Sequence, residues 1–175
     1  MQAQTRQKTF KLALAITAIV ALAAMSSTAY AGTATSSMAV SATVANNCTI
    51  SNGGVAFGTY DPIVANATTD LAVTGTITTT CTNGASVTVG LDQGAHAGTG
   101  STAAAPVRRM LAGTTNYLSY QLYTDSAHTT VWNATGPTVS GTGAAVATTV
   151  YALATKGQNV PTGSYADTVV ATVTF

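Results

Sequence analysis

The sequence predicts an all-β protein, an antiparallel sandwich of two sheets with the strand number and turn spacing of an immunoglobulin-like domain. Threonine, valine, alanine, glycine and serine dominate the chain, and glutamate is absent. Residues that favour helices are therefore scarce, while β-branched residues that favour pleated surfaces are plentiful. Apolar and polar residues alternate along many short runs, which is the period of a half-buried strand. Turn residues interrupt these runs about every ten residues.

The N-terminus has the pattern of an export signal. Arg6, Lys8 and Lys11 precede an apolar run of 13 residues over 12–24, which is too short to span a bilayer comfortably. A small-x-small pattern at Ala29 and Ala31 then predicts cleavage after Ala31. An uncleaved membrane anchor is the alternative interpretation. We expect export to the periplasm and then to the cell surface, with a mature chain of 144 residues.

The mature chain carries three basic residues against five aspartates, a net charge of −2 with histidine neutral. It has no basic run that would bind nucleic acid or an anionic membrane. Its length is that of one domain with a real core, and no internal repeat or linker divides it. We therefore expect a single folded domain with no nucleic-acid partner.

The mature chain opens with an alternating segment. Met38, Val40, Ala42 and Val44 fall on one face, and small or polar residues fall on the other. This is the period of a strand, yet it lies ahead of the first cysteine at a free end of the chain. The residues alone leave two readings open: the segment pairs within its own sandwich, or it fills the core of another copy.

Further strand-like runs follow at regular intervals. The runs over 71–81 and 86–91 flank an Asn-Gly pair at residues 83–84, which predicts a hairpin. Residues 92–105 are Gly, Ala, Ser and Thr-rich and predict a long exposed loop. In the run over 117–123, Leu118, Tyr120 and Leu122 share one face. The complete set of expected strand runs is 44–51, 55–62, 71–81, 86–91, 117–123, 129–133, 144–154 and 164–175.

The closing run reaches the last residue of the chain. Tyr165, Val169, Ala171, Val173 and Phe175 line one of its faces. We expect this strand to lie at a sheet edge, and an open edge with an apolar face invites pairing with another chain. With a spare strand at the other end, head-to-tail polymerisation is one of the two interpretations, and such heterologous contacts would give open filaments. The other interpretation is that the N-terminal segment pairs within its own sandwich.

Two cysteines, Cys48 and Cys81, survive cleavage. In an oxidising compartment an even pair most simply forms one disulfide. A metal or redox pair is the alternative, but there is no CxxC, and His96 and His128 are not at ligand spacing. We expect no metal and no cofactor.

The sequence gives little support to an enzyme. His96 and His128 sit in loop-like stretches, read as exposed, and there is no G-x-S-x-G nucleophile motif. The aspartates are spread singly, with no calcium-loop spacing, although Asp61 before Pro62 suits a turn and Asp167 suits a structural role. Trp132 and the tyrosines could stack on a ligand, but at strand spacing they are more typical of a core. We therefore expect no catalytic residue.

The quoted runs also carry a resemblance. The pieces CTIS, FGTYDP, TGTITTTCTNG, VTVGLDQG, RRML, LSYQLYTD, VW and GSYADTVVATVTF occur in the order seen in the spore coat protein U domain family. This family includes pilin subunits of archaic chaperone–usher pili. The likeness covers about Val44 to Phe175, and its closing strand is the most specific part. Ala171 departs mildly, since a larger aliphatic residue is usual there.

The resemblance implies an incomplete immunoglobulin-like sandwich, completed by a donor strand from a neighbouring subunit. It implies a signal peptide over 1–31, a donor extension over 32–44 and a pilin domain over 45–175. The inserted side chains would be Ser36, Met38, Val40, Ala42 and Val44. The acceptor groove and chaperone-docking strand would carry Tyr165, Val169, Ala171, Val173 and Phe175. The family's disulfide maps onto Cys48 and Cys81.

The expected function is therefore that of a structural pilus subunit, polymerising by donor-strand exchange for adhesion and biofilm formation. Its expected partners are identical or related pilin subunits, a periplasmic chaperone and an outer-membrane usher. One domain with a donor-like segment fits a shaft subunit rather than a tip adhesin. The alternative is a self-contained spore or cyst coat protein, or surface-binding module, that does not polymerise.

Overall fold

A computed structural model describes residues 30–175 of the chain. The chain divides into two units, residues 1–42 and residues 43–175. In the first unit, the described residues 30–42 form neither helix nor strand, and their side chains are exposed. The expected signal peptide lies almost wholly outside the described residues. All the strands of the described residues lie in the second unit.

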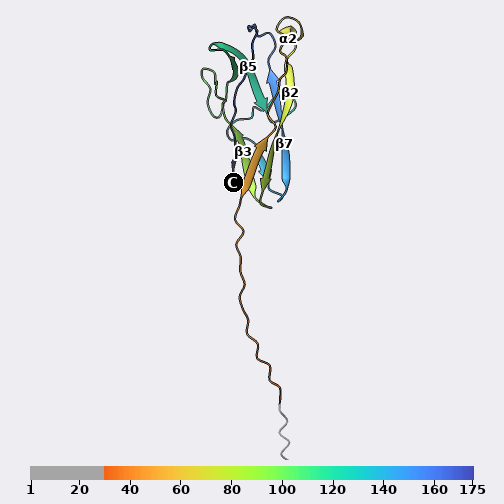
Figure 1. The fold of residues 1–175 in the computed structure, drawn as a ribbon, viewed down its shortest axis with the longest axis vertical. Coiled ribbons are helices and arrows are strands. Elements are labelled where there is room, and N and C mark those ends of the chain that lie inside the picture. The colour runs from red at the N-terminus through yellow and green to blue at the C-terminus, as the bar shows by residue number, and fades with distance from the viewer. Residues whose placement is uncertain (1–29) are drawn as a thin grey trace, which may run out of the picture. The chain divides into compact units, whose positions relative to one another are not determined.

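The second unit is an antiparallel β-sandwich of two sheets (Figure 1). The larger sheet has five strands in the order β1-β2-β7-β5-β4, and the smaller has three in the order β6-β3-β8. Every strand pairing is antiparallel. The bounds are β1 Cys48–Asn52, α2 Ala65–Thr68, β2 Leu71–Cys81, β3 Ser86–Leu91, β4 Arg108–Ala112, β5 Asn116–Tyr123, β6 Thr138–Ser140, β7 Ala145–Ala154 and β8 Ala171–Thr174. The all-β prediction is confirmed.

Alternation in the sequence places the core between the two sheets. In β5, Leu118, Tyr120 and Leu122 are buried as predicted, while Ser119 between them is exposed. Strand β3 follows the same period, since Val87, Val89 and Leu91 all point into the core. The inner faces of both sheets therefore meet in one apolar cluster that also contains Trp132.

The predicted hairpin at Asn83-Gly84 is wrong. Gly84 does turn the chain, with a positive φ of 82°. However, β2 pairs with β1 and β7, whereas β3 pairs with β6 and β8, so the two strands belong to different sheets. Both strands put an apolar face into the same core, and the turn crosses the end of the sandwich to connect the two layers. Asn-Gly specifies a reversal of the chain, not the strand that will be the hydrogen-bonding partner.

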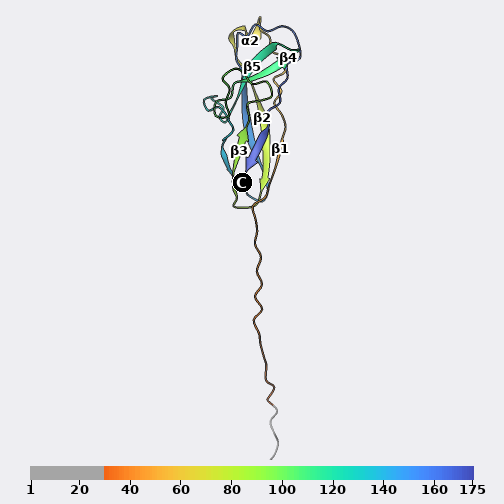
Figure 2. The same cartoon turned by 90° about the vertical axis from the view of Figure 1, so that its left-hand side faces the viewer.

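Three other expected runs are shorter or less regular than predicted. Residues 55–60 form no strand, and the run over 129–133 contributes only a bridge between Val131 and Tyr123. The closing run enters a sheet only at β8, preceded by a bridge from Ala166 to Leu111. Conversely, β4, β6 and the single-turn helix α2 were not expected. Figure 2 shows β4 beside β5 at the end of the sandwich that carries α2.

Cys48 and Cys81 form the predicted disulfide. They are register partners on the neighbouring strands β1 and β2. Their sulfurs pack in a small cluster with Ala85, Val87 and Val173, so the start of β1 and the end of β8 lie at the same end of the sandwich. Closing a loop across a sequence separation of 33 stabilises the fold by about 3–4 kcal/mol on loop-entropy grounds.

Candidate functional site: an open groove over the core

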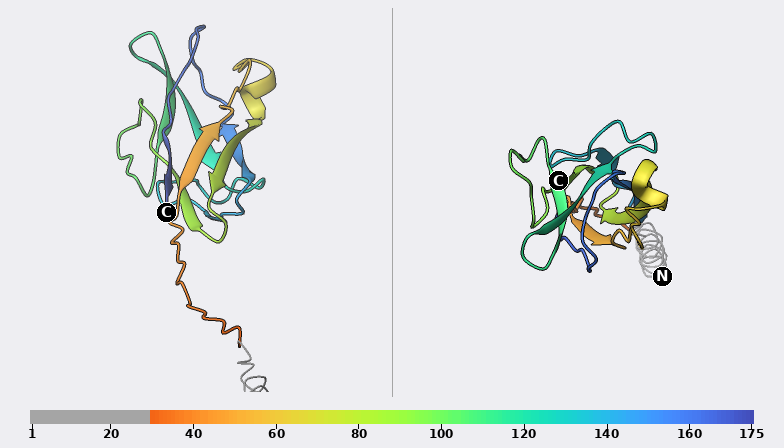
Figure 3. Two further views of the ribbon diagram at one scale, coloured as in Figure 1. Left: turned by 60° about the horizontal axis from the view of Figure 1, so that its bottom comes forward. Right: turned by 90° about the horizontal axis from the view of Figure 1, so that it is seen from above.

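A groove of about 980 Å³ opens one side of the sandwich down to its core. Figure 3 shows the C-terminal segment descending beside β1, and the groove lies between the stretches that extend from these two strands. One wall is the stretch over 54–62, which follows β1, and the other is the stretch over 160–169, which precedes β8. All the residues that line it lie within 52–171. A sandwich with a covered core would have no opening of this size at this place.

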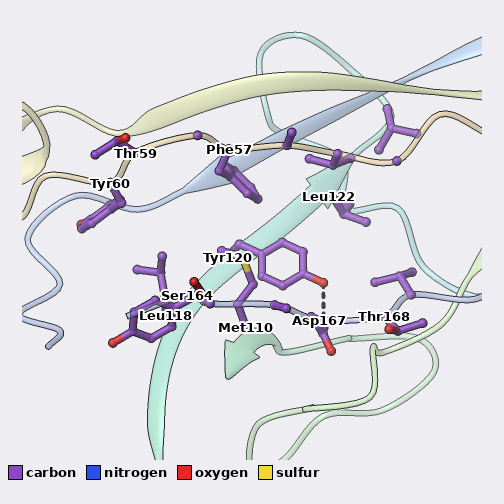
Figure 4. A pocket seen from close by; sticks show the side chains of 18 of the residues that line it. Phe57, Thr59, Tyr60, Met110, Leu118, Tyr120, Leu122, Ser164, Asp167 and Thr168 are labelled. Carbon is purple, nitrogen blue, oxygen red and sulfur yellow. Dashed lines mark hydrogen bonds between the residues drawn. The ribbon is translucent and has the colours of Figure 1, made fainter. Parts of the chain in front are cut away.

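The floor of the groove consists of apolar side chains that belong to the main core cluster. Leu118 and Leu122 of β5 and Val150 of β7 all line it, although each is almost fully buried. Figure 4 shows Leu118, Tyr120 and Leu122 along the floor, with Phe57 and Tyr60 on one side and Ser164, Asp167 and Thr168 on the other. An apolar surface of this kind favours an occupant that brings apolar side chains of its own.

Apart from the bridge between Ala166 and Leu111 of β4, the backbone of both walls belongs to no ladder. In the described part of the chain, β1 pairs only with β2, and β8 pairs only with β3. The wall over 54–62 contributes to no ladder, and side chains alternate along it, with Val55 and Phe57 turned into the core and Ala56 exposed. An extended chain lying in the groove would therefore find hydrogen-bonding edges beside it and apolar side chains beneath it.

Gly75 allows the wall over 54–62 to cross β2 closely. A Cβ atom at position 75 would lie 2.4 Å from the carbonyl oxygen of Gly54 and 2.7 Å from a methyl of Val55. No side chain fits in that space, so the absence of a side chain at Gly75 sets where this wall runs. The position of the wall in turn sets the width of the groove.

A polar cluster ties the second wall to the floor. The Tyr120 hydroxyl donates to Oδ2 of Asp167 at 2.8 Å, and Oδ1 of Asp167 accepts from the backbone N–H of His96 at 3.1 Å. Nδ1 of His96 lies 3.0 Å from the same Oδ1 atom. The Asp167 side chain is only 2% exposed, so these partners supply the hydrogen bonds that water would otherwise make. Burial, together with the Asp167 carboxylate, raises the pKa of Tyr120 above its ordinary value, and the hydroxyl stays a donor.

The interpretation of both histidines as freely exposed loop residues is wrong. His96 is half-buried against Asp167, and it fastens the loop over 92–98 to the wall that leads into β8. His128 is half-buried between the rings of Tyr123 and Tyr151, at centroid distances of 5.1 and 6.5 Å. Both rings therefore have packing or hydrogen-bonding partners that account for their positions.

Arg108 is buried behind the groove without a carboxylate partner. Its guanidinium donates to the backbone oxygens of Leu91, Asp92 and Trp132 and to Oε1 of Gln121. Desolvation lowers its pKa from the ordinary arginine value, but its charge is satisfied by these acceptors. The arginine joins the end of β3 to β4 and β5, which are the strands on which the groove floor rests.

The closing-run residues named from the sequence fall in different places. Tyr165, Val169 and Ala171 line the groove. Val173 lies beyond it and packs against the disulfide cluster, and the Phe175 side chain is about half exposed. The expected acceptor role of these residues stays a prediction. Phe57, Tyr60 and Met110 also line the groove and were not predicted as site residues, although the alternation at Val55 and Phe57 was a signal for Phe57.

The predicted donor residues are all exposed. Met38 and Val40 each expose 85% of their surface and Val44 exposes 81%, while Ser36 and Ala42 are also exposed. Isolated exposed apolar side chains are common, but three at alternate positions of one extended segment are an unburied strand face.

Other kinds of site find little support in the described residues. Residues 30–175 contain no group of three or more histidine, cysteine, aspartate or glutamate side chains placed to hold a metal ion. Within the same range, no helix has the length and hydrophobicity that crossing a bilayer requires.

The fold and the groove define a β-sandwich domain whose core is open along one side. The chain belongs to the Spore Coat Protein U domain family, whose model matches residues 34–172. It is also 44% identical to Protein U of Myxococcus xanthus over 171 residues, which cover 92% of this chain and 95% of that protein. The resemblance stated from the sequence is thereby confirmed.

Solved structures include one similar chain in a chaperone–tip adhesion subunit pre-assembly complex from the archaic chaperone–usher Csu pili of Acinetobacter baumannii. The sequences are 22% identical and the TM-score is 0.48. The match covers 76% of this chain and 40% of the other, so it spans less than half of that chain's length.

Proposed function

We propose that this protein is a structural subunit of a surface pilus, which polymerises by donor-strand exchange through a chaperone–usher pathway. The observation that carries the proposal is the groove of about 980 Å³, which reaches down to core side chains between β1 and β8, two edge strands with one strand partner each. An inserted strand supplies what such a site lacks, namely main-chain hydrogen bonds along its length and alternate side chains toward the floor.

The proposed donor is the segment over 32–44 of a second copy, here called the donor segment. Its inserted side chains would be Ser36, Met38, Val40, Ala42 and Val44. Burying Met38, Val40 and Val44 contributes about 1.5–3 kcal/mol each by transfer estimates. Each added main-chain hydrogen bond contributes about 0.5–1.5 kcal/mol net. The joint would therefore be long-lived, and a donor at one site with an acceptor at another gives an open filament.

The proposed partners before assembly are a periplasmic chaperone and an outer-membrane usher. An open apolar groove on an exported subunit would aggregate unless a chaperone covered it. A chaperone strand would use the same groove and dock on the wall that continues into β8, including Tyr165, Val169 and Ala171, with Val173 and Phe175 further along. The export signal over 1–31 would deliver the chain to the periplasm, and the finished fibre would stand on the cell surface. Adhesion and biofilm formation are the roles expected of such a fibre, and it needs no catalytic residue.

A polymerisation assay tests this function. The chain is expressed in a periplasm with and without residues 32–44, and unheated and boiled samples are compared on a denaturing gel. The proposal predicts a ladder of detergent-resistant oligomers that collapses on boiling and is absent in the truncated chain. A variant with Met38→Ser and Val40→Ser should lose the ladder. The matched control, Ala39→Ser with Thr43→Ser, changes the opposite face of the same segment and should keep it.

A second candidate function is a coat protein that folds alone. The description of the family as a spore coat domain favours it. Such a protein would bury the apolar face of residues 36–44 without another copy. A full-length chain that stays a stable monomer after removal of any co-purifying chaperone would support this candidate and reject the pilus subunit.

A further inference from the structure

Two consecutive apolar side chains stand in solvent at one end of the sandwich. Ile63 is 78% exposed and Val64 is 74% exposed, directly before helix α2. In the second unit, only Val44 among the large apolar side chains exposes more of its surface. An exposed pair of β-branched apolar residues in a turn gains nothing from the fold of its own chain.

The turn holds this Ile63–Val64 pair in one conformation. Oδ1 of Asp61 accepts the N–H groups of Ile63 and Val64 at 2.9 and 3.1 Å. The side chain of buried Asn66 also stabilises the turn, since its Oδ1 accepts the N–H of Asp61. The backbone oxygen of Asn66 accepts the N–H of Gly157. The pair is therefore displayed on a hydrogen-bonded platform, so that little conformational entropy would be lost on docking.

The pair lies at one mouth of the groove. Its neighbours Tyr60 and Pro62 line the groove, and Tyr60 is bonded to Thr155 beyond the end of β7. The opposite end of the sandwich carries Cys48, where β1 begins, beside Val173 of β8. Figure 1 shows α2 and the C-terminus at these two opposite ends.

The linker between the donor segment and the first strand of the domain is short and is held by hydrogen bonds. Only residues 45–47 separate Val44 from Cys48, and Thr82 holds them to the domain. The N–H of Thr82 donates to the backbone oxygen of Asn47 at 2.9 Å, and the N–H of Asn47 donates to Oγ1 of Thr82 at 3.0 Å. The four Cα-to-Cα steps from Val44 to Cys48 reach about 13–14 Å at most. When a donor segment binds in the groove of another copy, the Cys48 end of its own domain therefore lies against the end of that groove from which the segment emerges.

The donor segment must emerge from the groove at the end beside the Ile63–Val64 pair. If the donor segment emerged at the opposite end of the groove, the Cys48 end of its own domain would meet the Cys48 end of the acceptor domain. In a filament, the Cys48 end of every domain would then contact two neighbouring domains, each through a linker as short as residues 45–47. Emergence beside the pair uses opposite ends of each domain, so the contact repeats without a clash. It also makes the donor antiparallel to β8, the more stable pairing.

We propose that the Ile63–Val64 pair docks on the Cys48 end of the next copy, around Thr82 and Gly143, as a second contact beside the inserted strand. A shallow depression of about 290 Å³ beside the disulfide, lined by Asn47, Thr82 and Gly143 among others, is the surface that receives it. This inference rests on the proposed function. The second contact fixes the angle between successive domains, which a strand joint alone would leave free.

Site-specific photo-crosslinking tests the contact. A benzophenone amino acid replaces Val64 in the full-length chain, and the matched control replaces Val107, an exposed valine outside the groove. Boiling dissociates donor-strand joints, so only crosslinked dimers survive on the gel. We expect boiling-resistant dimers from position 64 and none from position 107, with the crosslink mapping near Thr82 and Gly143. Removal of residues 32–44 should abolish the product.

The outcomes separate the two claims. If unheated samples show the ladder of oligomers on the gel but position 64 gives no boiling-resistant dimer, the second contact is overturned and strand exchange is not. A crosslink that persists without residues 32–44, or that maps to the same pair in the partner, also overturns it. Absence of any ladder rejects the proposed function itself. As a second measurement, Ile63→Ser with Val64→Ser should keep the ladder but shorten the persistence length of fibres in electron micrographs, whereas Val107→Ser should change neither.

Discussion

The hydroxyl of Tyr120 donates a 2.8 Å hydrogen bond to Oδ2 of Asp167 (Figure 4). Tyr120 belongs to the groove floor on β5, and Asp167 belongs to the wall that leads into β8. Tyr120 lies in the larger sheet and Asp167 lies in a stretch that is not a strand, so the bond joins that stretch to the sheet at the groove. The neighbouring residue Ala166 forms a backbone bridge with Leu111 of β4, and the Tyr120–Asp167 bond adds a side-chain contact from the same wall to the groove floor.

Replacing Tyr120 by Phe should therefore loosen the groove without removing its apolar floor. The Phe ring retains the edge-on contact with Phe57 at 5.8 Å, but the Asp167 carboxylate loses one donor. We expect the free energy of unfolding to fall by about 1.5–3 kcal/mol, as for a hydrogen bond to a charged group. Urea unfolding at neutral pH measures the change. Tyr117→Phe is the control, because its hydroxyl makes no hydrogen bond within residues 30–175, and an equal loss in both variants would contradict the assignment.

Gly75→Ala should disturb the other wall. Its methyl would lie 2.4 Å from the Gly54 carbonyl oxygen, so the stretch over 54–62 has to shift. Overpacking of this kind costs about 1–3 kcal/mol. Gly53→Ala is the matched control, since the nearest atom to its Cβ is 3.9 Å away. The urea midpoint and the yield of gel ladder should both fall for Gly75→Ala and stay near wild type for Gly53→Ala, and unchanged values for Gly75→Ala would show that this wall does not shape the groove.

Acid should selectively weaken two turns. Backbone N–H groups of Ile63 and Val64 lower the pKa of Asp61, and those of Thr129 and Thr130 lower the pKa of Asp125. A carboxyl whose pKa is lowered by folding adds stability above its ordinary pKa near ~4 and loses it as the pH falls through the lowered value. Wild type should therefore be more stable than Asp61→Asn with Asp125→Asn at pH 6, and the difference should shrink below about pH 4. Thermal unfolding between pH 6 and 2 measures this difference, and a constant gap would contradict it.

The alternation of apolar and polar side chains in the sequence predicted much of this fold. The alternation in β2, β5 and β7 reports which residues face the core, and it needs no knowledge of the neighbouring strands. The hairpin prediction at Asn83-Gly84 was wrong because the same turn residues connect strands within one sheet and strands of two different sheets. Strand β4 was not predicted, because arginine is rarely buried in a strand, whereas Arg108 is buried by donating to backbone oxygens.

The groove could not be derived from periodicity. Residues 55–57 alternate as a strand does, yet residues 55–60 pair with no strand among the described residues 30–175, because a ladder depends on a neighbour as well as on the segment itself. Asp167 could be recognised as a candidate structural residue, but its contacts with Tyr120 and His96 join positions 47 and 71 residues apart. Only the arrangement of the two sheets brings these residues to the open side.

The central claim is that the groove takes the donor segment. The most direct measurement moves residues 33–44 from the N-terminus to a short turn after Phe175, so that the chain can fill its own groove antiparallel to β8. The account predicts a monomer without a ladder, whose urea midpoint exceeds that of the same chain carrying Met38→Ser, Val40→Ser and Val44→Ser in the moved segment. Equal midpoints for the apolar and polar segments would contradict it.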